Sequence, residues 1–527
     1  MFDSERGQDV QNLKPINFRP ILFCALSLFA GIILYRNHLV LGVWTVLTPI
    51  LIIGLICLLF YFIVDKAKRP MVIVTSVCCC VFVFIGMLSF GLKINSLKKN
   101  SVPDGYYTVV GEIKDVTYKN GGYYATLTNC TYDGIEGNDL ITSFLYEEVS
   151  LYDVIELKCI VKNCEIEEGK KIPNQIISGW PTSTSKVYSC RVIGKSKGVA
   201  PWFKTKTDAK FSSVLGEDFG ILSALLRGDV SEMCETVTTF RAVGIAHIFA
   251  VSGLHIGLIF AAMSFILGKL KINRVLKVIV TTSALIFYSY LCGFSPSSLR
   301  AVIMCTCIML SKLLGQKYDG VNALSIAAII VLLINAIDLF SAGFILSFTI
   351  CFSILVLSPP IKSILSFMPE EFSSSLAVLF ASQASALPLS IIMFGEFSLV
   401  SFFANFLLLP IVSILYYATV IGTLICVILP INEHIALFIP QILTVGIKGI
   451  TEFIAYFPIS LSYMTKPLLS IYYLLLISVS DFVNISKKAK FSCGVLLVVV
   501  LLFIATRSFF GVPSQNIGGI LDFYYNK

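Results

Sequence analysis

The sequence predicts a polytopic α-helical membrane protein of about 10–13 spans, with one small all-β domain inserted after its third hydrophobic segment. Of the 527 residues, 56% are hydrophobic and 14% are charged, whereas soluble domains are about 45–50% apolar and about 25% charged. The apolar residues are concentrated in runs long enough to cross a bilayer as helices. Between residues 95 and 200 the pattern instead alternates with the period of a β-strand.

The first three predicted spans form an N-terminal membrane segment, residues 1–94. They are Ile21–Tyr35, Leu39–Val64 and Met71–Leu92. Basic residues precede the first span and separate the second from the third, so the positive-inside rule predicts a cytoplasmic N-terminus and an extracytoplasmic β domain. About 18 mostly polar residues precede the first span and no Ala-x-Ala site follows it, which favours a retained helix over a cleaved signal peptide.

Residues 95–200 are predicted to form a small barrel or sandwich. Tyr107–Tyr118 and Tyr123–Cys130 flank an Asn-Gly-Gly turn at 120–122, which is a hairpin signal. Three further strand candidates follow: Leu140–Tyr146, Val154–Val161 and Val187–Ile193.

Four cysteines lie in this β region: Cys130, Cys159, Cys164 and Cys190. Outside the membrane such thiols can oxidise, and one or two disulfides would stabilise so small a core. The four could equally be small buried residues. Four cysteines allow three full pairings, and the sequence does not choose among them.

Residues 201–246 are predicted to form amphipathic helices at the membrane surface. Asp218–Arg227 has one apolar face and is broken by Arg227-Gly228-Asp229. Asp229 with Glu232 then resembles a capping box that opens a second helix, ending at Ala242. We expect three charged residues to order these helices: Arg227, Asp229 and Arg241.

The second membrane block covers residues 247–507 and is followed by a tail, residues 508–527. Its predicted spans are His247–Leu267, Val278–Phe294, Leu299–Leu314, Val321–Ile337, Phe344–Leu357, Ser374–Phe394, Val400–Leu429, Ile435–Tyr456, Leu468–Val483 and Cys493–Ala505. Pro410 interrupts a stretch long enough for a half-helix and a full one. Four basic residues follow the first span and mark a cytoplasmic loop: Lys269, Lys271, Arg274 and Lys277.

The densest group of polar residues within a predicted span runs from His247 to Gly257. On one helix, His247 and His255 would lie about 80° apart and share a broad face with Ser252. Gly253 and Gly257 have the Gly-x-x-x-Gly spacing of closely packed helices. Two interpretations remain open: a polar lining at a tight crossing, or histidines that only satisfy neighbouring groups.

The residue types also limit the chemistry. The chain has 4 histidines, with no third zinc ligand near these two, so no metal or other cofactor is expected. No P-loop is present, so the chain should not hydrolyse ATP. Ser252 and His255 could in principle form a hydrolase dyad, but such dyads are normally assembled between separate elements. We therefore expect no catalytic residues.

Several sequence blocks resemble the ComEC family of competence proteins, most specifically the Ser-Gly-Leu-His at 252–255. The other blocks, in order, are Ala224-Leu-Leu-Arg-Gly-Asp229, Phe240–Gly257, Gly293-Phe-Ser-Pro-Ser-Ser-Leu-Arg300, Asn322-Ala-Leu, Gly343–Phe348, Pro388–Ser398 and Asn405–Pro410. The resemblance covers about residues 220–415. It implies a channel for single-stranded DNA in the bacterial cytoplasmic membrane, with the β domain as the family's OB-fold-like domain.

The resemblance also implies partners. They are single-stranded DNA, the lipid bilayer, a cytoplasmic helicase-like ATPase, an external DNA receptor and a separate nuclease; a homo-oligomer is a further expectation. Many members carry a C-terminal metallo-β-lactamase-like domain, whose His/Asp signature this sequence does not contain. A nuclease activity is therefore not carried over. Residues expected near the DNA path are His247, Ser252, Gly253, His255, Arg300, Gln383 and Asn405.

The net charge of the β domain does not favour DNA binding. Residues 101–200 contain ten Lys and Arg residues against thirteen Asp and Glu, a net charge of −3, whereas phosphate binding needs basic surface. A basic patch could remain near Lys158, Lys162, Lys170 and Lys171. Four tyrosines could stack on bases, or could be ordinary strand residues: Tyr106, Tyr107, Tyr123 and Tyr124.

Three alternative functions remain at this point. The chain could transport another solute, act as an intramembrane hydrolase, or serve as a surface receptor whose spans only anchor the β domain.

Overall fold

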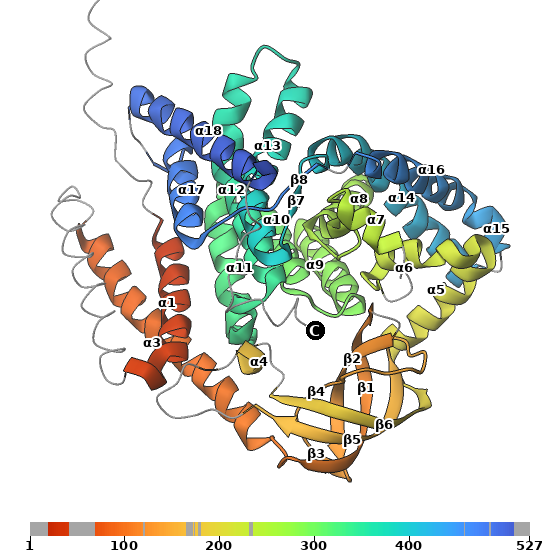
Figure 1. Ribbon diagram of the computed structural model, residues 1–527. Helices are drawn as coiled ribbons and strands as arrows, with labels where there is room; N and C mark the ends of the chain where they lie inside the picture. The colour runs from red at the N-terminus through yellow and green to blue at the C-terminus, as the bar shows by residue number, and fades with distance from the viewer. Residues whose placement is uncertain are drawn as a thin grey trace, which may run out of the picture.

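A computed structural model of the protein describes residues 19–41, 69–119, 122–164, 172, 174–177, 181–230, 236–429, 431–457, 459–483 and 486–510. Figure 1 shows a bundle of helices with a small β structure beneath it. The chain enters this β structure through α3 (Arg69–Lys99) and leaves it through α5 (Val199–Leu215). The predicted class, a helical membrane protein with an inserted small β region, is confirmed.

The N-terminal helices α1 (Pro20–Leu41) and α3 pack closely against each other through two glycines. A Cβ atom on Gly31 would overlap the carbonyl group of Val83, and one on Gly86 would overlap that of Leu28. Small residues of this kind allow helix backbones to approach in a membrane. The predicted spans Ile21–Tyr35 and Met71–Leu92 lie within these helices, whereas most of Leu39–Val64 lies outside the described residues.

The inserted domain is a β-barrel. Its strands are β1 (Gly105–Lys119), β2 (Gly122–Tyr132), β3 (Ile135–Glu136), β4 (Leu140–Ile141), β5 (Asp153–Asn163) and β6 (Thr182–Lys195). They pair in the order β1-β5-β6-β4-β2, and a further β1–β2 pairing closes the ring. The β4–β6 pair is parallel and the other pairs are antiparallel. Inward residues such as Val109, Leu127 and Leu157 fill the core.

The five predicted strands are present, but the third is shorter than expected. Only Leu140–Ile141 of the predicted Leu140–Tyr146 is a strand. Beyond it, the chain follows β2 irregularly, because the amide of Thr142 donates to the carbonyl of Ala125 and Leu145 forms an isolated bridge with Tyr123.

The barrel is attached to the helices at two places. On one side, α4 (Asn174–Ile177), which lies between β5 and β6, packs Ile176 and Ile177 into the same apolar cluster as Leu97 of α3. The Nδ2 atom of Asn138 also donates to the carbonyl of Leu97, at 2.6 Å. On the other side, residues 150–152 lie against α5.

The described part of the predicted segment 201–246 contains α5, which begins just before it, η2 (Gly216–Asp218), α6 (Phe219–Arg227) and α7 (Thr236–Ala242). Gly228 ends α6 in the left-handed region, with φ of 77°. Every residue of α6 from Gly220 to Arg227 is buried, so α6 is enclosed by its neighbours instead of presenting a polar face to solvent. The predicted capping box cannot be compared, because Glu232 lies outside the described residues.

The second membrane block contains most of the helices. They are η3 (Ala246–Ile248), α8 (Gly253–Lys269), α9 (Arg274–Leu291), α10 (Pro296–Leu313), α11 (Gly320–Ile334), η4 (Ala336–Phe340), α12 (Ala342–Ile364), α13 (Glu370–Phe394), α14 (Ser401–Ile428), α15 (Glu433–Ala436), α16 (Phe438–Ala455), α17 (Lys466–Val479) and α18 (Lys487–Phe510). A two-stranded ladder pairs β7 (Phe397–Ser398) with β8 (Ser460–Leu461).

Across the part of the chain that is described, nine helices are long and apolar enough to cross a membrane, and α8, α11 and α17 are shorter apolar helices. The protein is thus a multi-pass membrane protein. Pro410 lies inside the single 28-residue helix α14, so the expected half-helix and full helix are one continuous helix. Neighbouring groups can compensate for the backbone hydrogen bond that proline removes in such a setting.

Candidate functional site

The helix α8 begins with a reciprocal cap made by Ser252 and His255. The Oγ atom of Ser252 accepts from the amide of Leu254 at 3.2 Å, and Nδ1 of His255 accepts from the amide of Ser252 at 3.2 Å. Both bonds satisfy amides that the first turn of a helix leaves unpaired. The cap fixes the tautomer of His255, because Nδ1 must be unprotonated to accept and the proton of a neutral ring then lies on Nε2.

His255 is enclosed in the bundle. Its side chain is 1% exposed and its ring meets the ring of Tyr416 on α14 edge to face, with centroids 4.9 Å apart. Its Nε2 atom is buried and has no hydrogen-bond partner among the described residues. An enclosed polar atom without a partner is costly, so its presence calls for an explanation other than packing.

Arg300 on α10 connects three helices at the same level. Its Nη1 atom donates to the carbonyl of Ser347 on α12 at 3.0 Å, and its guanidinium lies 6.0 Å from the ring centroid of Phe348. A Cβ atom on Gly253, the first residue of α8, would lie 2.6 Å from Nη2 of Arg300. Gly253 therefore leaves the space that the guanidinium occupies. The Nε atom of Arg300 is buried and unpaired within the described residues.

Gln383 and Asn405 meet at the start of α14, with Ser401 between them. The Oγ atom of Ser401 donates to Oε1 of Gln383 at 3.3 Å, and Nδ2 of Asn405 donates to the carbonyl of Ser401 at 2.7 Å. Asn405 is 2% exposed and its Oδ1 atom has no partner in the described structure. Gly244, with φ of 80°, packs directly against Ser401.

Two predicted features of the His247–Gly257 segment are wrong. His247 and His255 do not share one helix, because His247 lies in η3 and Ser252 caps a new helix that starts at Gly253. The Gly253/Gly257 pair is not a crossing of two backbones either. Gly253 adjoins a side chain, and a Cβ on Gly257 would meet nothing within 4 Å.

Arg227 and Asp229 belong to a buried network of ion pairs with α5. Lys204 lies 2.9 Å from Asp208 and 2.7 Å from Asp229, while Nη2 of Arg227 lies 2.5 Å from Asp208. Arg227 also donates to Thr207, and Ser223 donates to Asp208 at 2.5 Å. Burial alone would lower the pKa of Lys204, but the carboxylates of Asp229 and Asp208 outweigh it and the pKa is raised.

Arg241 contributes differently from the other two predicted ordering residues. Its side chain is exposed at the end of α7, and its carbonyl accepts from the amide of Gly244 at 2.9 Å. Arg241 therefore stabilises the turn at Gly244 through its backbone carbonyl and not through its side chain.

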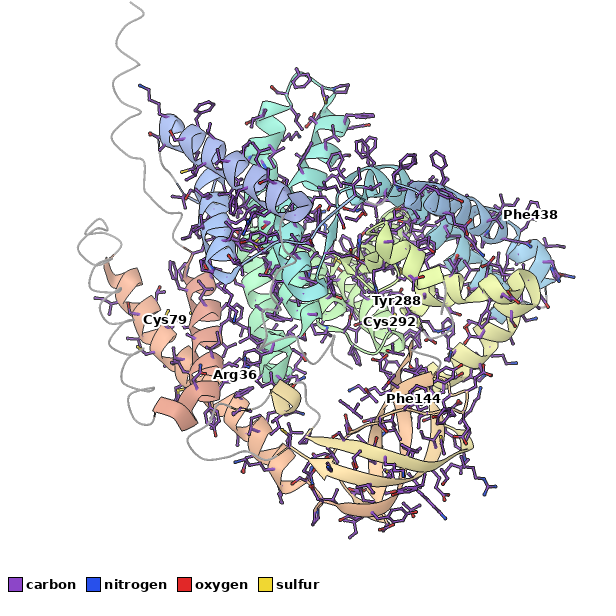
Figure 2. All side chains as sticks on the ribbon, viewed as in Figure 1. Arg36, Cys79, Phe144, Tyr288, Cys292 and Phe438 are labelled. Carbon is purple, nitrogen blue, oxygen red and sulfur yellow. The ribbon has the colours of Figure 1, made fainter. Side chains whose placement is uncertain are left out.

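The ion-pair network connects the barrel to the start of α8. A cavity of about 260 Å³ lies between residues 150–152 of the barrel and α5, and Lys204 and Asp208 line it. On the other side of the network, a Cβ on Gly228 would lie 2.8 Å from the side chain of Val251, which directly precedes Ser252. Figure 2 shows Tyr288 of α9 beside Cys292, the residue that follows this helix, and both contact the carbonyl of Leu226 in α6.

The four barrel cysteines carry free thiols in the structure, so none of the candidate disulfides is formed. Cys130 and Cys159 are part of the barrel core, Cys190 packs partly against it, and Cys164 packs against the cluster around α3 and α11. Cys130 and Cys159 are thus small buried residues, as in the second interpretation, whereas Cys164 and Cys190 are only half-buried.

Sequence reasoning missed the partners that the site residues use. Lys204 and Asp208 have the i, i+4 spacing of a helical ion pair, which was a usable signal. Ser347, Ser401 and Tyr416 had none, because a serine or tyrosine in an apolar helix does not indicate which distant residue it meets.

Comparison with known proteins gives one family match, to the family described as "Competence protein", over residues 225–483. That range begins within α6 and includes all seven predicted path residues. No solved structure is similar to the chain.

Three curated relatives are similar to this chain over part of its length. They are ComE operon protein 3 of Bacillus subtilis, 31% identical over 44% of the chain; uncharacterized protein YcaI of Escherichia coli, 24% identical over 36%; and recombination protein 2 of Haemophilus influenzae, 24% identical over 37%. The alignments span 30%, 27% and 27% of these relatives.

Proposed function

Because this chain belongs to the Competence protein family, we propose that it forms the membrane channel through which single-stranded DNA enters the cytoplasm during DNA uptake. One observation carries the proposal. Three predicted path residues, His255, Arg300 and Asn405, each have an enclosed polar atom without a hydrogen-bond partner in the described structure. A polar atom without a hydrogen-bond partner inside a membrane domain costs free energy, and a transported polar ligand that bonds to it would offset that cost.

The charge of these residues suits a polyanion. Arg300 supplies a guanidinium, whose planar set of donors matches a phosphate, and the start of α8 lies beside it at Gly253. The neutral His255 presents a donor at Nε2, given the tautomer that its cap requires. A phosphate that passes Arg300 and His255 would meet donors from both side chains, whereas the Oδ1 atom of Asn405 is an acceptor and would suit a base or sugar donor.

The proposed orientation places the barrel outside the cell. The ion-pair network and Ser252 mark the end of α8 nearest to the barrel, while Lys269, Lys271 and Arg274 lie at its other end, about 25 Å away for a helix of this length. A basic loop marks the cytoplasmic side. The N-terminus is then cytoplasmic in the bacterial cytoplasmic membrane.

We further propose that the barrel is of the OB-fold type. Its ring order and its one parallel pair, β4–β6, give a closed five-stranded barrel, the architecture that binds oligonucleotides in other proteins. The partners that fit this function are an external DNA receptor, a nuclease that removes one strand, and a cytoplasmic ATPase that pulls the other. A homo-oligomer is also consistent with it.

We propose no catalytic role for Ser252 and His255. Their side chains lie 3.3 Å apart, but within one helical turn, and both already serve the backbone cap. Failure of a serine-reactive probe to label Ser252 in membranes is the expected result; specific labelling would favour the hydrolase.

Two substitutions of His255 separate a structural cap from a lining residue. His255→Gln keeps an acceptor at the third helical position, as in the usual capping box. His255→Ala removes it, and the loss of this one hydrogen bond costs about 0.5–1.5 kcal/mol. We expect His255→Gln to reach the wild-type level in membranes but to lose uptake of labelled DNA into the cytoplasm. Normal uptake by the His255→Gln variant would show that His255 is only a cap.

Cells that lack the gene provide the test of the function itself. Given labelled duplex DNA, they should bind it at the surface but accumulate no labelled strand inside. Undiminished internal label would exclude the channel and leave transport of another solute.

A further inference from the structure

The outer face of the β1-β5-β6 sheet carries a pair of exposed tyrosines. The rings of Tyr106 on β1 and Tyr188 on β6 lie 5.7 Å apart, and the two side chains are 57% and 53% exposed. The Nζ atom of Lys186 lies 5.0 Å from the centroid of the Tyr188 ring. In proteins that bind single-stranded nucleic acids, bases stack on exposed aromatic rings and nearby cations contact the phosphate backbone.

The strand register places more basic residues on this face. Tyr106 pairs with Ile160, which pairs with Lys186, and the next outward row is Thr108, Lys158 and Ser189. One further row in each direction adds Lys162 and Arg191. All four basic side chains are exposed: Lys158, Lys162, Lys186 and Arg191. Lys158 and Lys162 are about 13 Å apart along β5, by the rise of a strand.

Among the described residues of the barrel, few acidic side chains lie near this face. Glu156 pairs with Arg191 across β5 and β6, and Glu112 lies one row beyond. Asp104, just before β1, accepts from the amide of Asn163 at 2.8 Å. The domain's net charge of −3 arises largely elsewhere. Other acidic residues flank β2, β3 and β4: Asp133, Glu136, Asp139, Glu147 and Glu148.

This separation of charge also distinguishes the tyrosine pair from another aromatic cluster of the barrel. Phe144 lies 4.8 Å from Tyr146 and 5.8 Å from Tyr124, by ring centroids, so these three form a second cluster. Glu147 and Glu148 directly follow it in the chain and are exposed. A polyanion would be repelled there and attracted to the face with Tyr106 and Tyr188.

We propose that the β1-β5-β6 face, centred on Tyr106 and Tyr188, binds single-stranded DNA before it reaches the helices. This inference rests on the proposed function and names the barrel surface that would receive the substrate. Tyr107 and Tyr123 are not part of this face, since both pack against the barrel core.

The test uses the full chain in lipid nanodiscs and a fluorescein-labelled oligothymidylate, with binding measured by anisotropy. The double variant Tyr106→Ala/Tyr188→Ala should bind roughly tenfold or more weakly, from the typical value of one stacked base. The matched control, Phe144→Ala/Tyr146→Ala, should bind like wild type. A duplex of the same length should bind less tightly than the single strand and respond little to loss of the tyrosines.

Salt dependence tests the basic residues separately. If Lys158 and Lys186 each neutralise one phosphate, Lys158→Gln/Lys186→Gln should lower the slope of log affinity against log salt by about 1.4, at about 0.7 for each contact to a single strand. The thermal unfolding of all variants is compared first, because exposed cross-strand pairs also stabilise sheets by about 0.2–1 kcal/mol.

The proposal is overturned if the full chain does not bind the oligonucleotide, if Tyr106→Ala/Tyr188→Ala binds like wild type, or if only the control loses affinity. These outcomes leave the channel untouched, since uptake by the His255 variants tests it independently. Loss of uptake at His255 together with unchanged binding by the tyrosine variant would uphold the channel and reject this surface.

Discussion

Lys204 on α5 and Asp229, 25 residues further along the chain, form an ion pair of 2.7 Å with side chains only 7% and 4% exposed. Burial of two charges is costly, and it is offset here because Asp208 and Arg227 complete a neutral group of two cations and two anions. The pair fixes α5, which leaves the barrel, to the turn that leads towards Ser252. It therefore links the helix that leaves the barrel to the segment that follows α6.

Removing one member of this network should destabilise the protein strongly. Asp229→Asn leaves Lys204 with Asp208 alone and Arg227 with an excess of positive charge around it. Loss of one partner of a buried pair typically costs about 3–5 kcal/mol, and the remaining contacts should keep the loss at the lower end. We expect a lower midpoint of thermal unfolding in detergent and less protein in membranes.

An exposed ion pair serves as the control for Asp229→Asn. Lys362 and Glu370 lie 3.0 Å apart, with side chains 42% and 84% exposed, so Lys362→Ala should leave the midpoint unchanged. Lys204→Met/Asp229→Leu should recover part of the lost stability, because an apolar pair leaves no uncompensated charge. Equal midpoints for wild type and Asp229→Asn would show that the network does not hold α5.

The sequence anticipated the elements better than their contacts. Alternation located the five strands, because strands of a small barrel have one face buried and one exposed. Hydropathy located the helices, because a helix that crosses a bilayer needs a long apolar run. Neither pattern contains the pairing of Lys204 with Asp229, since that contact depends on how α5 and α6 are brought together in three dimensions.

The error at His247 and His255 has a definite origin. The familiar capping box has Glu or Gln at its fourth position, and here His255 takes that role, so the helix start at Ser252 was overlooked. The apolar residues on both sides then extended the predicted span too far towards the N-terminus. The role of Gly253 was likewise set by Arg300, 47 residues away, and not by the nearby Gly257.

Gly253 and Gly257 should respond differently to the same substitution. In Gly253→Ala the new methyl group would lie 2.6 Å from Nη2 of Arg300, a flexible side-chain end that can move away. The fold should survive, but Arg300 should lose its bond to Ser347. If Arg300 contacts DNA, a lost charge-assisted hydrogen bond predicts uptake reduced roughly tenfold or more.

Gly257→Ala is the matched control, since its methyl group would meet no atom within 4 Å. We expect wild-type abundance and wild-type uptake of labelled DNA. Unchanged uptake by Gly253→Ala at wild-type abundance would argue that the position of Arg300 does not matter for transport.

The contact between α1 and α3 should tolerate no side chain at its two glycines. A Cβ on Gly31 or Gly86 would overlap backbone carbonyl groups, which cannot move without separating the helices. Gly31→Ala and Gly86→Ala should each lower abundance in membranes and the thermal midpoint. Gly343→Ala, where a Cβ would meet nothing within 4 Å, should not. Normal abundance of both α1/α3 variants would mean that this packing is dispensable.

Asp338 in η4 should make the free energy of unfolding depend on pH. Burial raises its pKa to about 6, while hydrogen bonding by Asn335 and the charges of Lys114 on the barrel and Lys93 on α3 lower it in part. Since the folded-state pKa exceeds the unfolded value near 3.8, the stability that the protonated group provides is complete below about pH 4. It is lost as the pH rises to about 6, by at most about 3 kcal/mol.

Asp338→Asn removes this titration while keeping an oxygen that can accept from Asn335, which donates to Asp338 at 2.7 Å. Other acids also titrate in this range, so the quantity to measure is the difference in thermal midpoint between variant and wild type at each pH. The thermal midpoint of the variant should rise relative to that of the wild type between pH 4 and pH 7. Lys114→Gln should widen that pH dependence, because it removes a charge that favours the ionised form. A difference that stays constant with pH would show that burial does not raise the pKa of Asp338.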